Sequence, residues 1–441
     1  MSTLRDVIRR SARLTALARG VRDAVRGPGP SHALTRRDSA ETPGIDGVAE
    51  LLRVVPRAAK AGDGPRLNLL IPTLSPRRVF GGARTAMDLF GELGRRFPRQ
   101  RVVSFTPVTG VNVETLDGFV IGNAGDAETP SRVVVAAPVG TETTLAVEPD
   151  DVFLATFWST AELAIRLSRW QASTFGGAAR PFAYLVQDFE AGFYPWSAQF
   201  ALARSTYAAD VPTIAVVNSG LLAAYLDGQG LAFAGRYTFE PRLDPRLRPL
   251  VDQPAGTRRR RIVAYGRPGT ARNAFPLVVE GLRDWVGRGG GDGWEVVSAG
   301  EPHSPVELGR GLVMGRVGKL PIEGYGSLLR ESAVGLSLMV SPHPSYPPLD
   351  MAHLGMRVVT NSFGPKDLSA WHENIASVAS LTAEAIGEAL LAATRAFEAD
   401  PGAGDRARPL RDDYLAEGPV FPFVDELAAR LLAGSTSPPP S

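Results

Sequence analysis

The sequence contains no cysteine, which excludes disulfide bonds and every metal site built on thiolate ligands. Its histidines show neither an HExxH motif nor another metal-ligand spacing, so we expect no bound metal and no cofactor: His32, His303, His343, His353 and His372. No apolar run approaches the roughly 18 residues that cross a bilayer, and the N-terminus lacks the apolar core of a signal peptide. The formal net charge is only +2, which argues against binding to nucleic acid.

What the sequence does contain fits a soluble protein of two domains. Its 441 residues are 44% hydrophobic and 21% charged, and this length allows two cores of ordinary size. We therefore expect a cytoplasmic location. The expected segments are a basic segment with a flexible linker (1–44), two α/β domains (45–245 and 258–400), a helical return segment (401–434) and a disordered tail (435–441).

Residues 1–26 have a basic amphipathic pattern. Apolar residues such as Leu4, Val7 and Leu14 recur near one helical face, and arginines crowd the rest of the helix. Such a helix can lie on an anionic membrane surface, which would bring peripheral contact with the inner face of the plasma membrane. The alternative is a solvated helix that packs weakly on this protein or on a partner.

Apolar runs alternate with helical patterns from residue 66 onward. Strands are expected at 67–71, 101–105, 132–137, 151–155, 181–186 and 213–217, and in a second series at 261–265, 294–298, 334–340 and 357–360. Helices are expected at about 47–61, 81–97, 322–331 and 420–434, and the run Arg258–Arg261 is expected to be a solvated strand entry. Strands separated by helices predict the α/β class, with two Rossmann-like, doubly wound domains that face each other across a cleft.

The stretch Ser341–Asn361, SPHPSYPPLDMAHLGMRVVTN, is the most informative about function. It follows a buried strand and contains a short helix that we expect to open near Pro347-Pro348, with Asp350 in its first turn. Helix N-termini at the carboxyl ends of parallel strands bind anionic ligands in α/β proteins. A carboxylate there can accept hydrogen bonds from ribose hydroxyls while nearby cations face phosphate. The stretch therefore predicts a nucleotide-sugar pocket.

Two glycine-containing turns are further candidates for binding a diphosphate. Arg267 and Arg272 lie five residues apart between a strand and a helix, where both can reach a diphosphate, although arginines at a turn can also be merely solvated. In the first domain Gly81 and Gly82 precede a helix, and their backbone amides can approach the same group. The alternative for the glycine pair is a simple turn.

The loop after the strand at 181–186 reads Gln187-Asp-Phe-Glu-Ala-Gly-Phe-Tyr-Pro-Trp196. Asp188 and Glu190 are candidate catalytic carboxylates, because carboxylates are costly to bury unless they are paired or face a ligand. Tyr194 and Trp196 are candidate acceptor-binding residues, since aromatic faces beside carboxylates commonly hold a sugar. The alternative is a loop whose aromatic rings seal the core while Asp188 caps the next turn.

Three motifs together resemble a known family over residues 66–400: Gln-Asp-Phe-Glu-x-x-Phe-Tyr-Pro-Trp, Arg-Pro-x-x-x-Arg-Asn-Ala-Phe and Ser-Pro-His-Pro-Ser-Tyr-Pro-Pro-Leu. They resemble the retaining GT-B glycosyltransferases of family 4 and, more narrowly, the WsaF-type bacterial rhamnosyltransferases. The family 4 pattern has Glu, seven residues and a second Glu. Asp350 matches the second acidic position, whereas the first falls on Pro342, so that His343 or Ser345 is the candidate replacement.

The resemblance implies roles for individual residues. Arg267 and Lys319 would bind the donor's diphosphate, Asp350 would bind the ribose, Tyr346 would pack beside the nucleotide, and Asp188 would lie beside the transferred sugar or the acceptor. The departing diphosphate would itself take the proton of the attacking hydroxyl on the same face of the sugar. This chemistry needs no divalent metal, and the sequence has no Asp-x-Asp metal motif.

The function that the resemblance implies is transfer of L-rhamnose from dTDP-L-rhamnose to a saccharide or glycolipid acceptor in bacterial cell-surface glycan biosynthesis. The first domain would bind the acceptor and the second domain the donor. One alternative is a nucleotide-sugar epimerase or hydrolase, which would act without an acceptor. Another is a non-catalytic sugar-binding subunit that kept the fold, for which Pro342 is the main argument.

Overall fold

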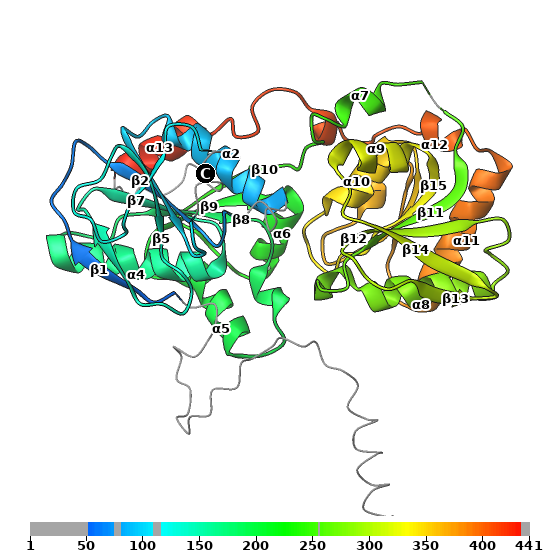
Figure 1. The fold of residues 1–441 in the computed structure, drawn as a ribbon, viewed down its shortest axis with the longest axis horizontal. Coiled ribbons are helices and arrows are strands. Elements are labelled where there is room, and N and C mark those ends of the chain that lie inside the picture. The colour runs from blue at the N-terminus through cyan, green and yellow to red at the C-terminus, as the bar shows by residue number, and fades with distance from the viewer. Residues whose placement is uncertain (1–51, 75–80, 109–115, 255, 434–441) are drawn as a thin grey trace, which may run out of the picture. The chain divides into compact units, whose positions relative to one another are not determined.

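A computed structural model describes residues 52–74, 81–108, 116–254 and 256–433 (Figure 1). The basic segment and linker at 1–44, with the membrane contact expected for 1–26, and the tail at 435–441 lie outside these ranges. Within them, no helix is both long and apolar enough to cross a membrane.

The first sheet has eight strands, and all neighbouring strands run parallel. From edge to edge they are β10 (Gly235–Phe239), β9 (Thr213–Asn218), β8 (Phe182–Val186), β7 (Asp151–Ala155), β2 (Arg66–Ile71), β3 (Arg99–Ser104), β5 (Arg132–Ala136) and β4 (Val120–Ile121). The central strands are entirely buried, as expected for a parallel sheet that is covered on both faces. The strand order reverses between β2 and β7, and ligands bind such sheets at the carboxyl ends of the strands beside the reversal.

Helices cover both faces of the first sheet. The helix α4 (Trp158–Phe175) packs on one face, and α2 (Gly81–Gly94) packs on the other together with α13 (Val424–Ala433). The helix α13 comes from the C-terminal part of the chain and lies beside α2 (Figure 1). The chain therefore returns to the first sheet after it has completed the second.

The helix expected at 47–61 is wrong for the residues that the structure describes. They contain the strand β1 (Val54–Ala58), which pairs in parallel with β6 (Thr143–Val147). Val54 and Val55 favour a strand because β-branched side chains lose freedom in a helix. Pro56 is tolerated because the pair forms a separate two-stranded sheet, in which each strand has an unpaired edge.

The second sheet has seven strands, and only the pair β13–β14 is antiparallel. In order they are β13 (Val306–Gly309), β14 (Leu312–Gly318), β12 (Glu295–Gly300), β11 (Arg259–Gly266), β15 (Ser332–Leu336), β16 (Arg357–Asn361) and β17 (Ile375–Val378). The order reverses between β11 and β15. Because β11 and β15 run parallel, the loops that follow them leave the same end of the sheet, beside the reversal.

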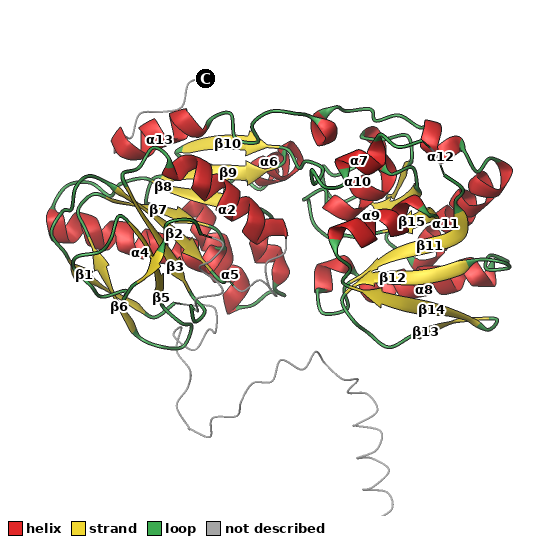
Figure 2. Cartoon of the chain, turned by 45° about the horizontal axis from the view of Figure 1, so that its top comes forward, coloured by secondary structure: helices red, strands yellow, loops and turns green. Residues whose placement is uncertain are grey.

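Helices also cover both faces of the second sheet (Figure 2). The helices α8 (Phe275–Gly287) and α11 (Ala383–Ala399) pack on one face, and α9 (Ile322–Arg330) and α10 (Tyr346–His353) pack on the other. The strand expected at 334–340 ends at Leu336. Beyond it the chain turns toward the loop after β11, where the Val340 amide donates to the Arg272 carbonyl at 2.7 Å.

The run Arg258–Arg261 differs from the expectation of a solvated entry. Arg259 and Arg260 are exposed, whereas Arg258 and Arg261 are buried. The Arg258 guanidinium pairs with Asp405 at 2.6 Å and donates to the carbonyl oxygens of Leu329, Ser332 and Leu354. Burial of this charge is compensated by those acceptors, and Arg258 thereby anchors the short helix α12 (Ala403–Arg406).

Candidate functional site

The candidate site begins at the end of β8, in the first sheet. Asp188 follows this strand by two residues and is 6% exposed. Its Oδ1 accepts hydrogen bonds from the Phe189 amide at 2.8 Å and from the Ser341 hydroxyl, while its Oδ2 lies 3.4 Å from Nε of Arg272. Burial raises the pKa of Asp188, and Arg272 and Ser341 oppose that shift. One carboxylate therefore joins the first sheet to two loops of the second.

Arg272 lies in a single turn of 3-10 helix, η4 (Ala271–Asn273), in the loop after β11. Its guanidinium carbon is 4.2 Å from the ring centroid of Phe193, which follows Asp188 in the first sheet's loop. Nε of Arg272 is buried without a hydrogen-bond partner among the described residues, although the side chain remains 30% exposed. Burial lowers the pKa of Arg272, but an arginine stays charged. The site therefore presents a partly desolvated cation that can still bind an anion.

Lys366 belongs to the same cluster, although the sequence did not point to it. It lies in the turn between β16 and β17 and is fully buried, where its ammonium donates to the Met339 carbonyl at 2.5 Å. Burial lowers the pKa of Lys366 to about 7, and Asp188 opposes the shift. One signal was available: the chain uses arginine for almost every cation, and its lysines are only Lys60, Lys319 and Lys366.

His343, a candidate for the donor site, is buried in the loop that connects β15 to α10. Its Nδ1 accepts a hydrogen bond from the Ser345 amide at 2.9 Å, so a neutral ring carries its proton on Nε2. Burial lowers the pKa of His343 to about 3, with further contributions from Lys366 and Arg272. The residue next to Pro342 is therefore a neutral hydrogen-bond donor at physiological pH.

Glu190 is turned away from Asp188, into the core of the first sheet. It is 2% exposed, and its Oε2 accepts hydrogen bonds from the Tyr184 hydroxyl at 2.9 Å and from the Trp158 amide. The Glu190 amide donates to the Tyr207 hydroxyl at 3.0 Å. Burial raises the pKa of Glu190 to about 8, so its carboxyl group is mostly protonated at neutral pH. These contacts favour a structural role for Glu190.

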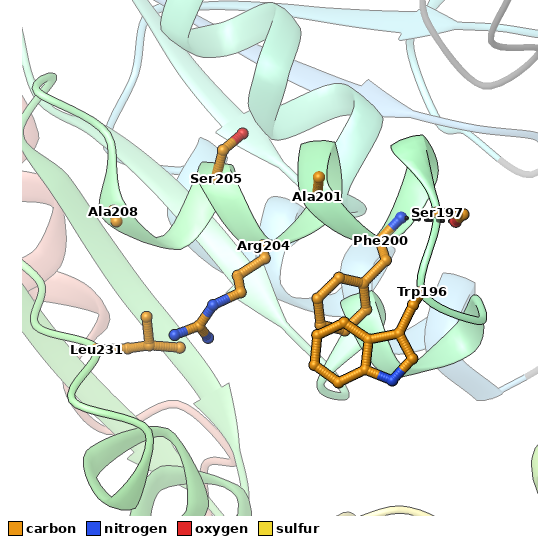
Figure 3. Close-up of a pocket in the computed structure, with 8 residues that line it drawn as sticks. All are labelled: Trp196, Ser197, Phe200, Ala201, Arg204, Ser205, Ala208 and Leu231. Atoms are coloured by element: carbon orange, nitrogen blue, oxygen red, sulfur yellow. Dashed lines mark hydrogen bonds between the residues drawn. The ribbon is translucent and has the colours of Figure 1, made fainter.

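The two candidate acceptor-binding aromatics lie in different surroundings. The hydroxyl of Tyr194 accepts a hydrogen bond from Nε1 of Trp158 at 2.8 Å. Trp196 is 90% exposed, and its ring centroid lies 4.8 Å from that of Phe200 on α5 (Ala198–Ser205). Figure 3 shows the rings of Trp196 and Phe200 side by side, with the Arg204 side chain extending toward Leu231. These residues line a pocket of about 510 Å³. Trp196 is therefore the more exposed of the two aromatic rings, whereas Tyr194 is half-buried.

Asp350 lies in the second turn of α10. The expectation of a first-turn position is wrong, because the helix begins at Tyr346 and Pro347-Pro348 occupy its next two positions, where a missing amide costs nothing. Asp350 is 8% exposed and accepts a hydrogen bond from the Tyr414 hydroxyl at 2.6 Å. Burial raises the pKa of Asp350 to about 7, and the Tyr414 hydrogen bond opposes the shift.

Tyr346, the first residue of α10, is a second contact between the two sheets. Its hydroxyl accepts a hydrogen bond from Nδ2 of Asn218 at 3.4 Å, and Asn218 is the last residue of β9. His343 lies close by, with its ring centroid 5.8 Å from that of Tyr346. Tyr346 thus joins the start of the helix that carries Asp350 to His343 and to the end of β9.

The two remaining candidate cations of the second sheet are on the loops beside these groups. Arg267 directly follows β11, and its Nε donates to Glu301 at 3.1 Å. Glu301 also accepts hydrogen bonds from the Gly269 amide and the Thr270 hydroxyl, so it fixes the turn between the two candidate arginines. Lys319 is exposed in the bend directly after β14.

The glycine pair lies next to the Asp188 loop. Gly81 and Gly82 are the first residues of α2, and Gln187 donates to the Gly82 carbonyl at 2.9 Å. A β-carbon at Gly82 would stand 3.0 Å from the Gln187 side chain, so a larger residue would push against the segment that carries Asp188. Gly82 therefore lies against Gln187, the residue that precedes Asp188.

Comparisons with known proteins identify the family of the chain. Residues 66–220 match the family described as WsaF, N-terminal domain, and residues 260–391 match the family described as WsaF, C-terminal domain. The O-antigen biosynthesis protein RfbC of Myxococcus xanthus is 36% identical over 217 residues, which are 48% of this chain and 15% of that protein. The chain thus spans only a small part of that relative.

Solved structures with the same arrangement of sheets include two named carbohydrate enzymes. The sucrose-phosphate synthase from Thermosynechococcus elongatus is 12% identical with a TM-score of 0.50, covering 83% of this chain and 94% of that chain. WaaG, a glycosyltransferase involved in lipopolysaccharide biosynthesis, is 12% identical with a TM-score of 0.50, covering 83% of this chain and 99% of that chain. At this identity the likeness concerns the fold alone. The chain belongs to the WsaF family, as its motifs predicted, and it has the GT-B fold.

Proposed function

We propose that the chain is a retaining glycosyltransferase of cell-surface glycan synthesis, which transfers L-rhamnose from dTDP-L-rhamnose to a saccharide or glycolipid acceptor. The observation that carries this proposal is the contact of Asp188, at the carboxyl end of β8, with Arg272 and Ser341, which follow β11 and β15. A nucleotide sugar has a diphosphate for the cations and a sugar for the hydrogen-bonding groups of this cluster. The relative named an O-antigen biosynthesis protein supports the glycan class.

In this proposal, cations bind the donor's diphosphate. Arg267 and Arg272 lie on one turn, and Lys319 lies on the loop after β14. Arg272 would give up its contact with Asp188 and bind a phosphate oxygen instead. Its guanidinium is partly exposed and has several N–H donors with which to do so. These charges would stabilise the departing diphosphate, which in turn takes the proton of the attacking acceptor hydroxyl.

The sugar would lie between Asp188 and His343. Asp188 is the only one of the two candidate carboxylates that contacts the second sheet, and its negative charge would stabilise positive charge that develops on the sugar. The Nε2 proton of His343 would be donated to a sugar hydroxyl, in place of the carboxylate that Pro342 excludes. Glu190 would act only by holding the loop in place.

The nucleoside would lie along α10, with Asp350 accepting hydrogen bonds from the ribose and Tyr346 packing beside the nucleotide. This proposal divides the chain into an acceptor-side domain at 45–245 and a donor domain at 258–400. Trp196, with its exposed ring, is the proposed acceptor contact of the first domain. Tyr194 would support the acceptor loop through Trp158.

A thermal-shift panel of nucleotides tests the donor assignment. We expect dTDP and dTDP-rhamnose to raise the unfolding temperature by several degrees more than UDP or GDP, since a ligand at 100 times its Kd stabilises the folded state by about 2.7 kcal/mol. The shift should be smaller in Lys319→Ala and unchanged in Lys60→Ala, a matched change of an exposed lysine in the first domain. Preference for UDP or GDP would overturn the rhamnosyl assignment. No response to any nucleotide would favour a non-catalytic subunit, the reading that Pro342 supports.

A further inference from the structure

Tyr414 holds the carboxylate of Asp350 from a distant part of the chain. It lies in a single 3-10 turn, η6 (Asp413–Leu415), on the connection that runs from α12 to α13. The residue is 2% exposed, its hydroxyl donates to Oδ1 of Asp350 at 2.6 Å, and its carbonyl accepts a hydrogen bond from the Leu243 amide. Both its backbone and its ring are therefore fixed.

The ring of Tyr414 is also packed against histidine. Its centroid lies 4.9 Å from that of His353, one turn after Asp350 on α10. The ring centroid of His353 lies 4.7 Å from that of His372, and Nδ1 of His353 donates to the Leu349 carbonyl at 2.8 Å. A phenylalanine at position 414 would keep this packing and lose only the hydroxyl.

The two oxygens of Asp350 are in different states. Oδ1 accepts the Tyr414 hydrogen bond, whereas Oδ2 accepts none from the described residues, and the residue as a whole is 8% exposed. Among the described residues, the charged group that shifts the pKa of Asp350 is Asp244, a second carboxylate. The ionisable groups around Asp350 are four tyrosines and one carboxylate: Tyr265 on β11, Tyr325 on α9, Tyr346 on α10, Tyr414 and Asp244. The negative charge of Asp244 disfavours the ionised form of Asp350. Tyr414 is the one that donates a hydrogen bond to the carboxylate.

We propose that Tyr414 is a positioning residue for donor binding: its hydroxyl fixes Asp350 so that Oδ2 meets the ribose hydroxyls of the nucleotide. The inference rests on the proposed role of Asp350. If Tyr414 has this role, the connection between α12 and α13 is part of the donor site. This connection lies outside both residue ranges matched to the WsaF family.

Replacement of Tyr414 by phenylalanine is expected to weaken binding of dTDP by at most about a hundredfold at pH 7, because the strength of the lost hydrogen bond to the Asp350 carboxylate limits the effect on the ligand. The Tyr414 hydrogen bond lowers the pKa of Asp350, which burial places at about 7. Its loss raises that pKa, so a larger share of Asp350 is protonated at neutral pH. Because the ribose needs the ionised acceptor, the fall of affinity with decreasing pH should begin at a higher pH in Tyr414→Phe.

The measurement is calorimetric titration of the full chain with dTDP, UDP and GDP between pH 5.5 and 8.5. The matched control is Tyr325→Phe, which removes a buried hydroxyl that has no described partner and should leave the midpoint of the pH curve in place. Asp350→Asn should abolish the pH dependence, and adding Tyr414→Phe to it should weaken binding little further. Thermal unfolding of each variant checks that it is folded.

The possible outcomes separate the two claims. If the wild type binds a nucleotide but Tyr414→Phe binds it equally well, or more weakly by the same factor at every pH, the positioning role is overturned while the donor site stands. If the wild type binds none of the three nucleotides, the proposed function and this inference both fail. A midpoint displaced to higher pH only in Tyr414→Phe supports the inference.

Discussion

Replacing Arg272 with alanine is expected to lower kcat by about a hundred- to a thousandfold, the usual effect of removing one group that stabilises charge in a transition state. The reason is its place in the site. Arg272 lies between Asp188 and the Phe193 ring, where it is partly removed from water, and a phosphate oxygen bound there would interact with it more strongly than in bulk solvent.

Two further variants make this prediction specific. Arg272→Lys keeps the charge but loses the planar group that stacks on Phe193, so an intermediate kcat is expected. Arg283→Ala removes an exposed arginine of α8 that pairs with Glu280 and donates to the Glu307 carbonyl, away from the site, and it should leave kcat unchanged. The measurement is kcat and the donor KM of each variant, with the unfolding temperature as a check. A kcat of Arg272→Ala close to the wild-type value would remove Arg272 from the site.

The second large effect is expected for Asp188→Asn, which should lower kcat by about a hundredfold or more and change donor binding less. Asparagine keeps one oxygen for the Ser341 hydroxyl and the Phe189 amide. It loses the negative charge that would stabilise the sugar in the transition state, and its amide would point donors toward Arg272.

The contrast with Glu190→Gln tests which carboxylate matters. Since burial raises the pKa of Glu190 to about 8, its carboxyl is mostly neutral at pH 7, and glutamine resembles that form. We expect a small change in kcat for Glu190→Gln. Initial rates at saturating donor compare the two variants directly, and a larger loss for Glu190→Gln than for Asp188→Asn would reverse their assigned roles.

The two sheets and the loops that hold Asp188 and Arg272 could be predicted, because they depend on local sequence patterns. Apolar runs such as those of β2 and β11 predict buried parallel strands, whose carboxyl ends must meet at one edge. The loops that hold Asp188 and Arg272 could therefore be named from the sequence. Their direct contact could not, because it depends on how the end of β8 meets the loop after β11.

The remaining parts of the site depend on contacts that no local pattern shows. Lys366 comes from a turn without an apolar period, and Tyr414 comes from a connection far along the chain. The inward direction of the Glu190 side chain is set by the Tyr184 hydroxyl and the Trp158 amide, which lie on separate elements. Alternation of polar and aromatic residues in this loop fits both a sugar site and a sealed core.

The most direct test of the proposed function is release of dTDP from dTDP-L-rhamnose, measured with and without a panel of saccharide acceptors. We predict release that depends on an acceptor, together with a product heavier by one deoxyhexose. Release at the same rate without any acceptor would show a hydrolase, and a changed nucleotide sugar without release would show an epimerase. Absence of turnover with every nucleotide-sugar donor and acceptor would contradict the account and leave a binding protein.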